Sequence, residues 1–438
     1  AIAEGVIIAP NTTFDLRYNP SVNSISIRGE SDAVEYAGVI MADLECNVNN
    51  NKDRNSLVLA LDTEGIYAGT RALMPNFNIH GDINNNTVDI AVAFNEESNN
   101  GNSAMLALKA ELQRDTQTMR RKVHVDVIPS YFNNSTLHWE LYSNGIDITP
   151  STVSINNLHI ARPDQQLIID GNISNSLQDS VRLTLENFDI SGLSVLLERT
   201  GYDIDGVSNG YAVVKSALQN PEVNASIALD SLKINGISVA PQFITSNWDM
   251  VGDRAHIIIT DRGLNETVVE GYYQPISNRY SAKAKIRNAS MSLLKPYLKS
   301  VLSDIEGVAD IDAKIEGEGN KAILSGDLSA KDFGATVNYT KVRYKAPTAK
   351  FTIDSNHIRT VRTPLYDVYG NIGHLTLDVD LSNLDNVTYD ISAEITKMLA
   401  LNTTPQDNDT FYGHVYATGE ATFKGDKRGT KMNIDITS

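Results

Sequence analysis

The sequence predicts an all-β protein, an elongated and curled sheet of antiparallel or mixed strands with an apolar interior and one or two short helices. The first observation is alternation with a period of two, as in Val181-Arg-Leu-Thr-Leu185, which places apolar side chains on one face of a strand. The second is the scarcity of segments with a helical period. The third is that turn-forming stretches such as Gly81–Asn86 separate runs of strand length.

The first half of the chain is predicted to be a succession of short strands. Apolar positions alternate in the runs 6–9, 14–18, 25–28, 39–46, 57–61 and 88–94. Met105–Leu112 contains good helix formers, but its apolar positions fall on one strand face, so a strand is the preferred interpretation. Residues 137–174 then give several strand-sized segments joined by short loops, which is the pattern of a meander.

The centre of the chain, residues 181–344, carries a strand–helix–strand pattern that occurs twice. Helices are expected at Leu193–Arg199 and Ser290–Leu302, where Pro296 marks a break or a first-turn position. We expect both helices to act as lids or plugs on an open sheet edge or groove end. Alternation resumes after Tyr344 and reaches the last residues. The pattern divides the chain into four segments: 1–100, 101–180, 181–280 and 281–438.

Composition limits the classes of function. Apolar residues make up 41% of the 438 residues, enough to bury a continuous interior, and 21% charged residues argue against disorder. The net charge of −17 is spread along the chain. It argues against binding to nucleic acid, which requires clustered Lys and Arg, and against docking on an anionic membrane surface.

The single cysteine, Cys46, cannot form an internal disulfide and is interpreted as a small, buried or half-buried strand residue. The sequence has no run of 18 or more apolar residues, so no transmembrane helix is expected, nor does it begin with a secretory signal. Both ends lie in strand-like sequence, around Val6–Ile8 and Met432–Ile436. We interpret the chain as an internal piece of a longer protein.

The physical question is what covers the apolar face. With strands about 4.8 Å apart, roughly 25 to 30 strands stacked in one direction make a ribbon of about 120–145 Å. A flat ribbon would expose its apolar face to water, at about 25 cal/mol per Å². Curling would line the inside with that face, and sheet twist favours coiling. An acyl chain in such a groove would gain about 0.8 kcal/mol per buried CH₂, while its charged head group would remain in water.

The candidate lining residues share alternating positions in the runs after residue 180. They are Leu183, Leu185, Ile227, Leu229, Ile286, Ile311, Ile315, Leu377, Val379, Ile391 and Ile395. The alternative is that the same residues form the core of an ordinary closed sandwich that binds no ligand.

Several segments, in this order, carry a resemblance to a known family. They are the segment around Trp139 followed by 155–171, the unit 183–206, Leu324-Ser-Gly-Asp-Leu-Ser-Ala330 with Val337–Tyr344, and Phe411–Gly425. Together they resemble the TamB family, and its Bacteroidetes members most closely. This family belongs with the AsmA-like proteins of the bacterial envelope. The resemblance covers residues 100 to 438, and the first hundred residues are similar only in their general pattern of short alternating strands.

The resemblance implies an elongated β-taco, or repeating β-groove, that spans the periplasm. No cofactor is expected. It implies a part in phospholipid transfer between the inner and outer membranes and in outer-membrane biogenesis. The implied partners are phospholipid acyl chains, an Omp85-type outer-membrane protein, and the inner membrane through an anchor absent from this sequence. The alternative within the family is a translocation and assembly module subunit that helps insert outer-membrane or autotransporter proteins.

No catalytic or metal-binding motif is found. The eight histidines are scattered, with neither an HExxH motif nor metal-ligand spacing. Asp170-Gly-Asn172 and Asp82–Asn86 resemble pieces of calcium loops but lack the EF-hand spacing, so they are interpreted as turns. Asp203 with Asp205 could act as an acid–base pair on a glycan, but strand-face acids in a chain of this charge need no such role. We therefore expect no enzymatic activity.

Two functions from other classes remain open. The chain could be a periplasmic assembly factor whose open sheet edge pairs with strands of client proteins. It could also be a carbohydrate-active β-helix enzyme, which would require a clustered acid pair in a cleft and a shorter, strictly regular coil repeat.

Overall fold

A computed structural model describes residues 6–22, 24–51, 56–69, 71–95, 102–114, 121–134, 137–193, 202–383, 386–407 and 412–437. In these ranges 31 strands belong to one sheet, and every strand pair is antiparallel, so the predicted all-β class is confirmed. The contacts divide the chain into two units, residues 1–188 with 211–221 and residues 189–210 with 222–438. The four segments expected from the sequence pattern stay a prediction.

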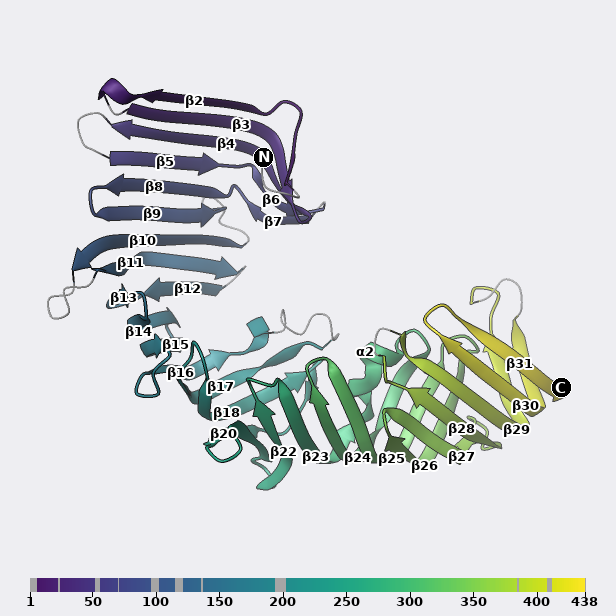
Figure 1. Ribbon diagram of the computed structural model, residues 1–438. Helices are drawn as coiled ribbons and strands as arrows, with labels where there is room; N and C mark the ends of the chain where they lie inside the picture. The colour runs from purple at the N-terminus through teal and green to yellow at the C-terminus, as the bar shows by residue number, and fades with distance from the viewer. Residues whose placement is uncertain are drawn as a thin grey trace. The chain divides into compact units, whose positions relative to one another are not determined.

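The first unit is a succession of antiparallel strands (Figure 1). Its strands are β1 (Val6–Ile8), β2 (Thr13–Asn19), β3 (Ser24–Tyr36), β4 (Val39–Asn51), β5 (Ser56–Asp62), β6 (Gly65–Ala68), β7 (Arg71–Pro75), β8 (Asn78–Asn84), β9 (Thr87–Phe94), β10 (Ser103–Arg114), β11 (Arg121–Asn134), β12 (Leu137–Tyr142), β13 (Ile146–Ile148), β14 (Thr152–Arg162), β15 (Gln165–Ser174) and β16 (Ser180–Asp189). The prediction of a strand at Met105–Leu112 is confirmed by β10, and Cys46 lies half-buried in β4.

The second unit continues the pattern with longer strands. After β17 (Ile204–Lys215), whose second half belongs to the first unit, come β18 (Glu222–Ile234), β19 (Ile237–Ser238), β20 (Gln242–Asp249), β21 (Arg254–Asp261), β22 (Glu266–Gln274), β23 (Arg279–Ser290), β24 (Leu302–Glu318), β25 (Lys321–Val337), β26 (Val342–Asp354), β27 (His357–Tyr366), β28 (Ile372–Asp380), β29 (Thr388–Thr403), β30 (Gly413–Asp426) and β31 (Gly429–Thr437). Asn235 and Gly236 have φ of 51° and 75°, which gives the β18–β19 hairpin its tight two-residue turn.

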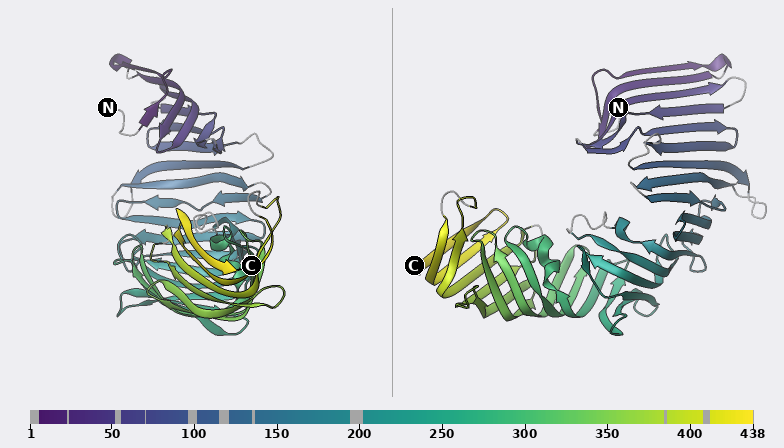
Figure 2. Two further views of the ribbon diagram at one scale, coloured as in Figure 1. Left: turned by 90° about the vertical axis from the view of Figure 1, so that its right-hand side faces the viewer. Right: turned by 180° about the vertical axis from the view of Figure 1, so that it is seen from behind.

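Strands of the second unit are bent by β-bulges. Register shifts occur after Ile286 in β23, after Ser303 in β24, after Thr360 in β27 and after Ile395 in β29. A residue with positive φ lies in each of the four interruptions: Asn288, Asp304, Arg362 and Lys397. Because a bulge bends its strand and increases the local twist, the sheet of this unit curves into a U, seen end-on in Figure 2 (left).

The helical segment of the second unit is shorter than expected. In place of a helix over Ser290–Leu302, the structure has a 3₁₀ turn, η4 (Met291–Leu294), followed by one α-helical turn, α2 (Lys295–Leu298). The Ser290 side chain caps the start, and Pro296 stands in the first turn of α2, where a proline is tolerated. The second expected helix, Leu193–Arg199, lies outside the described residues except for Leu193. That residue ends a short 3₁₀ turn, η2 (Ser191–Leu193), and the structure describes the chain again from residue 202.

Two sequence-based interpretations are corrected here. Asp170-Gly-Asn172 does not form a turn but lies inside β15. Gly171 has φ of 118°, and a Cβ on it would lie 2.2 Å from the carbonyl oxygen of Ser180 on β16. Glycine is therefore required because the neighbouring backbone approaches closely, and not because the chain turns. In Asp82–Asn86 only the last two residues form a turn, since β8 continues to Asn84.

Candidate functional site

The candidate site is one face of the second unit's sheet. Residues directly opposite each other on antiparallel strands point to the same side, so strand register defines a face. One row of paired residues crosses ten strands, from β18 to β28: Ile227, Ile244, Ile259, Val269, Ala284, Ala313, Gly326, Ile353, Ile358 and Val379. The row contains no charged residue. We call this side the apolar face.

The apolar face collects most of the predicted lining residues. Ile227 and Val379 belong to the row above, and a parallel row pairs Ile286 with Ile311. Seven lining residues outside the first row lie on this face by register or by alternation along the same strands: Leu229, Ile286, Ile311, Ile315, Leu377, Ile391 and Ile395. The remaining two, Leu183 and Leu185, lie on β16 in the first unit, opposite Ile169 and Leu167.

The lining side chains are half-buried. All eleven predicted residues have intermediate exposure, and none belongs to the buried core. The residues that do reach the core of this face are mainly small, such as Ala309 and Ala330, each 1% exposed. Small side chains take up little space at the bend of the sheet, so the larger aliphatic side chains of this face stay in contact with solvent. This arrangement differs from a sealed sandwich core, whose apolar side chains are close-packed.

Part of the apolar face is covered by the helical segment. Met291 forms a buried cluster with alanines of β24, β25 and β26, and Leu294 and Leu298 pack against it. Ile311 and Leu328 border the same cluster. These contacts place the segment against this part of the apolar face, and its action as a lid stays a prediction.

A second set of contacts joins β26 and β29, two strands that are not neighbours in the sheet. The Tyr344 hydroxyl on β26 donates to the carbonyl of Leu399 on β29 at 3.0 Å, and the Asn402 N–H donates to the carbonyl of Thr340 at 2.9 Å. Burial, with the nearby Asp367 carboxylate, raises the pKa of Tyr344 to about 12. Asp367 is 3% exposed and accepts the Leu399 N–H at 2.8 Å.

The opposite face of the unit is charged. Cross-strand ion pairs join Lys331 to Asp310 at 2.7 Å and Arg287 to Asp312 at 2.9 Å. The hydrogen bond from Lys331 holds the pKa of the Asp310 carboxyl below its usual range. Asp310 and Asp312 flank Ile311 in sequence, so their side chains point to the side of the sheet opposite the Ile311 side chain. We call this solvent-exposed polar side the charged face.

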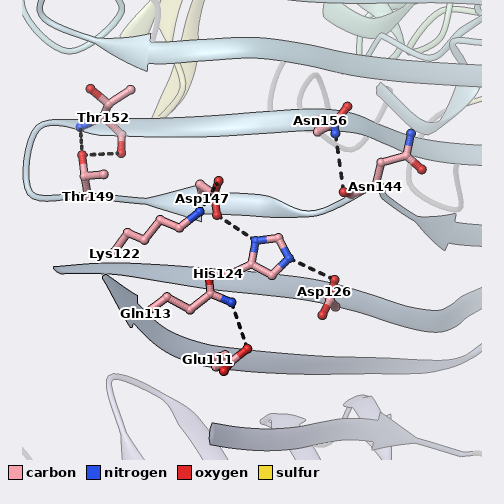
Figure 3. Close-up of polar contacts among 10 residues, drawn as sticks. All are labelled: Glu111, Gln113, Lys122, His124, Asp126, Asn144, Asp147, Thr149, Thr152 and Asn156. Carbon is pink, nitrogen blue, oxygen red and sulfur yellow. Dashed lines mark hydrogen bonds and ion pairs between the residues drawn. The ribbon is translucent and has the colours of Figure 1, made fainter. Parts of the chain in front are cut away.

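The first unit contains a polar cluster on strands β11 and β13 (Figure 3). His124 Nδ1 lies 2.7 Å from an oxygen of Asp147 and Nε2 lies 3.3 Å from Asp126, while Lys122 Nζ lies 3.0 Å from the second oxygen of Asp147. The hydrogen bond with Asp147 raises the pKa of His124. Both ring nitrogens are held by carboxylates, so neither is left to activate a hydroxyl. A cavity of about 280 Å³ lies beside this cluster.

Other polar candidates are dispersed. Asp205 pairs with Lys233 at 3.3 Å, His256 with Glu270 at 2.9 Å, and His357 with Asp378 at 2.7 Å. Within the described ranges no group of three or more His, Cys, Asp or Glu side chains is placed to hold a metal ion.

Sequence reasoning missed several lining residues. Ile244, Phe351 and Ile353 extend the apolar rows. Their signal was the same alternation, but single runs such as Phe351-Thr-Ile353 are too short to stand out. Nothing in the sequence indicated Tyr344 and Asp367, because their roles depend on a contact between β26 and β29.

The fold and this site define a class, an open single-layer antiparallel sheet whose one face is apolar and only partly covered. No family model, curated protein or solved structure matches the chain. No helix in the described part of the chain is long and apolar enough to cross a bilayer.

Proposed function

We propose that this chain carries phospholipid acyl chains along the apolar face of its curved sheet, as part of lipid transfer between the two membranes of a cell envelope and of outer-membrane biogenesis. The observation that supports this most directly is the unbroken row of paired apolar residues from Ile227 on β18 to Val379 on β28. A ligand held by such a row has no fixed position along it. The face therefore suits a conduit better than a pocket for one ligand.

Energetics favour an acyl chain as the occupant. Each CH₂ group that leaves water for this face gains about 0.8 kcal/mol, and the half-buried side chains of the face lose their own contact with water. A head group would remain outside, because an unpaired charge is costly to bury. The resemblance to the TamB family points to the same cargo. It also supports a periplasmic location, an inner-membrane anchor outside this sequence and an Omp85-type partner.

Photo-crosslinking tests this proposal. A photoreactive residue at Ile311 or Leu377 on the apolar face is expected to form phospholipid adducts in cells that express the full-length protein. The matched controls are Ser329 and Ser392, which lie on the charged face of neighbouring strands. Adducts at the controls but not at Ile311 and Leu377 would exclude the conduit.

A second function has one observation in its favour. Along β2, Phe14, Leu16 and Tyr18 are 69%, 55% and 60% exposed, and in the described residues β2 pairs only with β3. An exposed apolar edge strand can add a strand from another chain, as an assembly factor for outer-membrane proteins would require. Crosslinks from Leu16 to client proteins, with no lipid adduct at Ile311, would favour this function.

A further inference from the structure

The last strand of the second unit has a free edge (Figure 1). Within the described ranges β31 pairs only with β30, and all nine of its residues are exposed. Met432, Ile434 and Ile436 are 47%, 52% and 38% exposed. They continue the apolar face, because Met432 lies opposite Phe423, which in turn lies opposite Ile391. An edge strand of this kind presents unpaired N–H and C=O groups, to which another strand can be added.

The charges on the other face of β31 lie opposite charges of the same sign. Lys431 lies opposite Lys424 of β30, and Asp435 lies opposite Glu420. Like charges directly opposite each other on neighbouring strands destabilise a sheet. Lys424 is already paired with Asp390 at 2.6 Å, whereas Lys431 and Asp435 make no ion pair in the described part of the chain. An added strand is therefore favoured if it brings a carboxylate to Lys431 and an ammonium group to Asp435.

A second copy of β31 brings both groups. In an antiparallel pair of two β31 strands centred on Asn433, Lys431 of each copy lies opposite Asp435 of the other, and Met432 lies opposite Ile434. The pair has twofold symmetry, so both ion pairs form together. A shift of two residues in either direction places Asn433 opposite Lys431 or Asp435 and loses both ion pairs. A shift of one residue sets apolar side chains against polar ones. The charges therefore specify a single register.

The exposed edge of the first unit differs in this respect. Asp15 and Arg17 of β2 are paired with each other at 2.6 Å, and Arg28 of β3 lies opposite Asp15. The charges of β2 therefore already have partners of opposite sign, while those of β31 do not. This difference favours β31 as the edge that takes a second copy.

We propose that two copies of this chain pair through β31, edge to edge and antiparallel, in the register centred on Asn433. The inference does not rest on the proposed function. In this pair the two copies form one sheet, and the apolar row that runs through Ile391, Phe423 and Met432 meets Ile434 of the second copy on the same side. The apolar face thus continues from one copy into the other, and a conduit along it would gain length.

The test reverses the two charges singly in the full chain and then mixes the variants. K431D places a carboxylate opposite Asp435 of the other copy, and D435K places an ammonium group opposite Lys431. Each variant alone is expected to dimerise about tenfold more weakly than the unsubstituted chain. An equimolar mixture should form heterodimers about as tightly as the unsubstituted chain forms homodimers, because opposite charges then meet at both positions. Sedimentation equilibrium measures the dissociation constants at about 0.15 M salt, which screens the long-range repulsion between copies of net charge −17.

The control is K427D, in the turn that precedes β31, where the side chain is exposed. It changes the net charge as K431D does, and its dimer should be as tight as that of the unsubstituted chain. Circular dichroism melting curves confirm that the variants fold.

Three results would overturn the inference. The first is an unsubstituted chain that stays monomeric at the highest concentration measured. The second is an unchanged dimer in K431D and D435K, which would show that the copies meet through another surface, such as the open apolar face. The third is an assembly that grows beyond a dimer, which would show that β31 pairs with the β2 edge of a further copy in an open chain.

Discussion

Glycine at a close approach of two strands is the clearest constraint at the scale of single residues. Gly326 lies mid-strand in β25 with φ of 141°, and a Cβ there would lie 2.1 Å from the carbonyl oxygen of Asp312. Gly326→Ala is expected to lower the free energy of unfolding by roughly 2 kcal/mol or more, because it adds a backbone clash to an unfavourable φ. Urea unfolding of the full chain measures this.

The control for that substitution is Gly81→Ala. Gly81 also lies mid-strand, in β8, but has no left-handed φ, and its Cβ would meet its nearest neighbour at 3.5 Å. A loss for Gly81→Ala as large as that for Gly326→Ala would contradict the close-approach argument.

The carboxylate of Asp367 makes the second residue-scale prediction. Burial alone raises the pKa of Asp367, but the N–H groups of Leu399, Asn371 and Tyr369 outweigh it, so the pKa lies below its ordinary value. A depressed folded-state pKa contributes stability above the unfolded pKa of about 3.9, and this contribution is lost as pH falls through the folded pKa. Asp367→Asn should therefore cost roughly 2 kcal/mol at pH 7.

The measurement for Asp367 is the free energy of unfolding as a function of pH, with the unsubstituted chain as the reference. The difference between the unsubstituted chain and Asp367→Asn should shrink below about pH 4, because the carboxyl group then takes up a proton and loses its charge. A difference that stays constant from pH 7 to pH 3 would show that the charge of Asp367 contributes nothing.

The alternating pattern predicted which face of the sheet a residue lies on, but it did not predict where the backbones of two strands approach closely. Ile227, Ile311 and Leu377 could be placed on one face because the strand period is two and the pairing is antiparallel. The position of Gly171 inside a strand could not be predicted, because the sequence Asp-Gly-Asn is also typical of turns. What decides between the two is the nearby backbone of Ser180, which belongs to another strand.

The η4–α2 segment is the element whose packing can be tested alone. Met291 is 7% exposed and forms a cluster with Ile305 and Ala309. Met291→Ala is expected to lower the free energy of unfolding by about 2–3 kcal/mol, because it leaves a cavity under the segment. Thermal or urea unfolding measures the change.

The matched control at this scale is Lys299→Ala, which follows α2 and has an exposed side chain. Its effect should stay within about 0.5 kcal/mol. If Met291→Ala were equally silent, the segment would not be held on the apolar face by packing.

Bulges explain why the positions at which the strands bend could not be predicted from the sequence. Asn288 and Asp304 adopt positive φ, which short polar residues tolerate, but Asn and Asp are also the residues that mark ordinary turns. Arg362 and Lys397 adopt it as well, and their residue types give no signal at all. The pairing of β26 with β27 is interrupted beside the bulge at Arg362, so the sequence pattern could not predict this interruption either.

At the scale of the second unit, the proposed conduit requires that the apolar face be continuous. Leu328 on β25 pairs with Ile311 on one side and Phe351 on the other, so Leu328→Asp places a charge in the middle of a row. An acyl chain crossing that point would have to bury the charge or leave the face. We expect Leu328→Asp to reduce co-purified phospholipid several-fold, measured by mass spectrometry of lipid extracts.

Ser329→Asp supplies the comparison, because Ser329 is the next residue on the same strand and lies on the charged face between Asp310 and Lys350. The same charge added there should leave the lipid content unchanged, provided that both variants melt as the unsubstituted chain does. Since the two substitutions differ by one residue and by one face, equal lipid loss in both would mean that the apolar row is not the path. Lipid loss confined to Leu328→Asp is the result that only a continuous apolar face predicts.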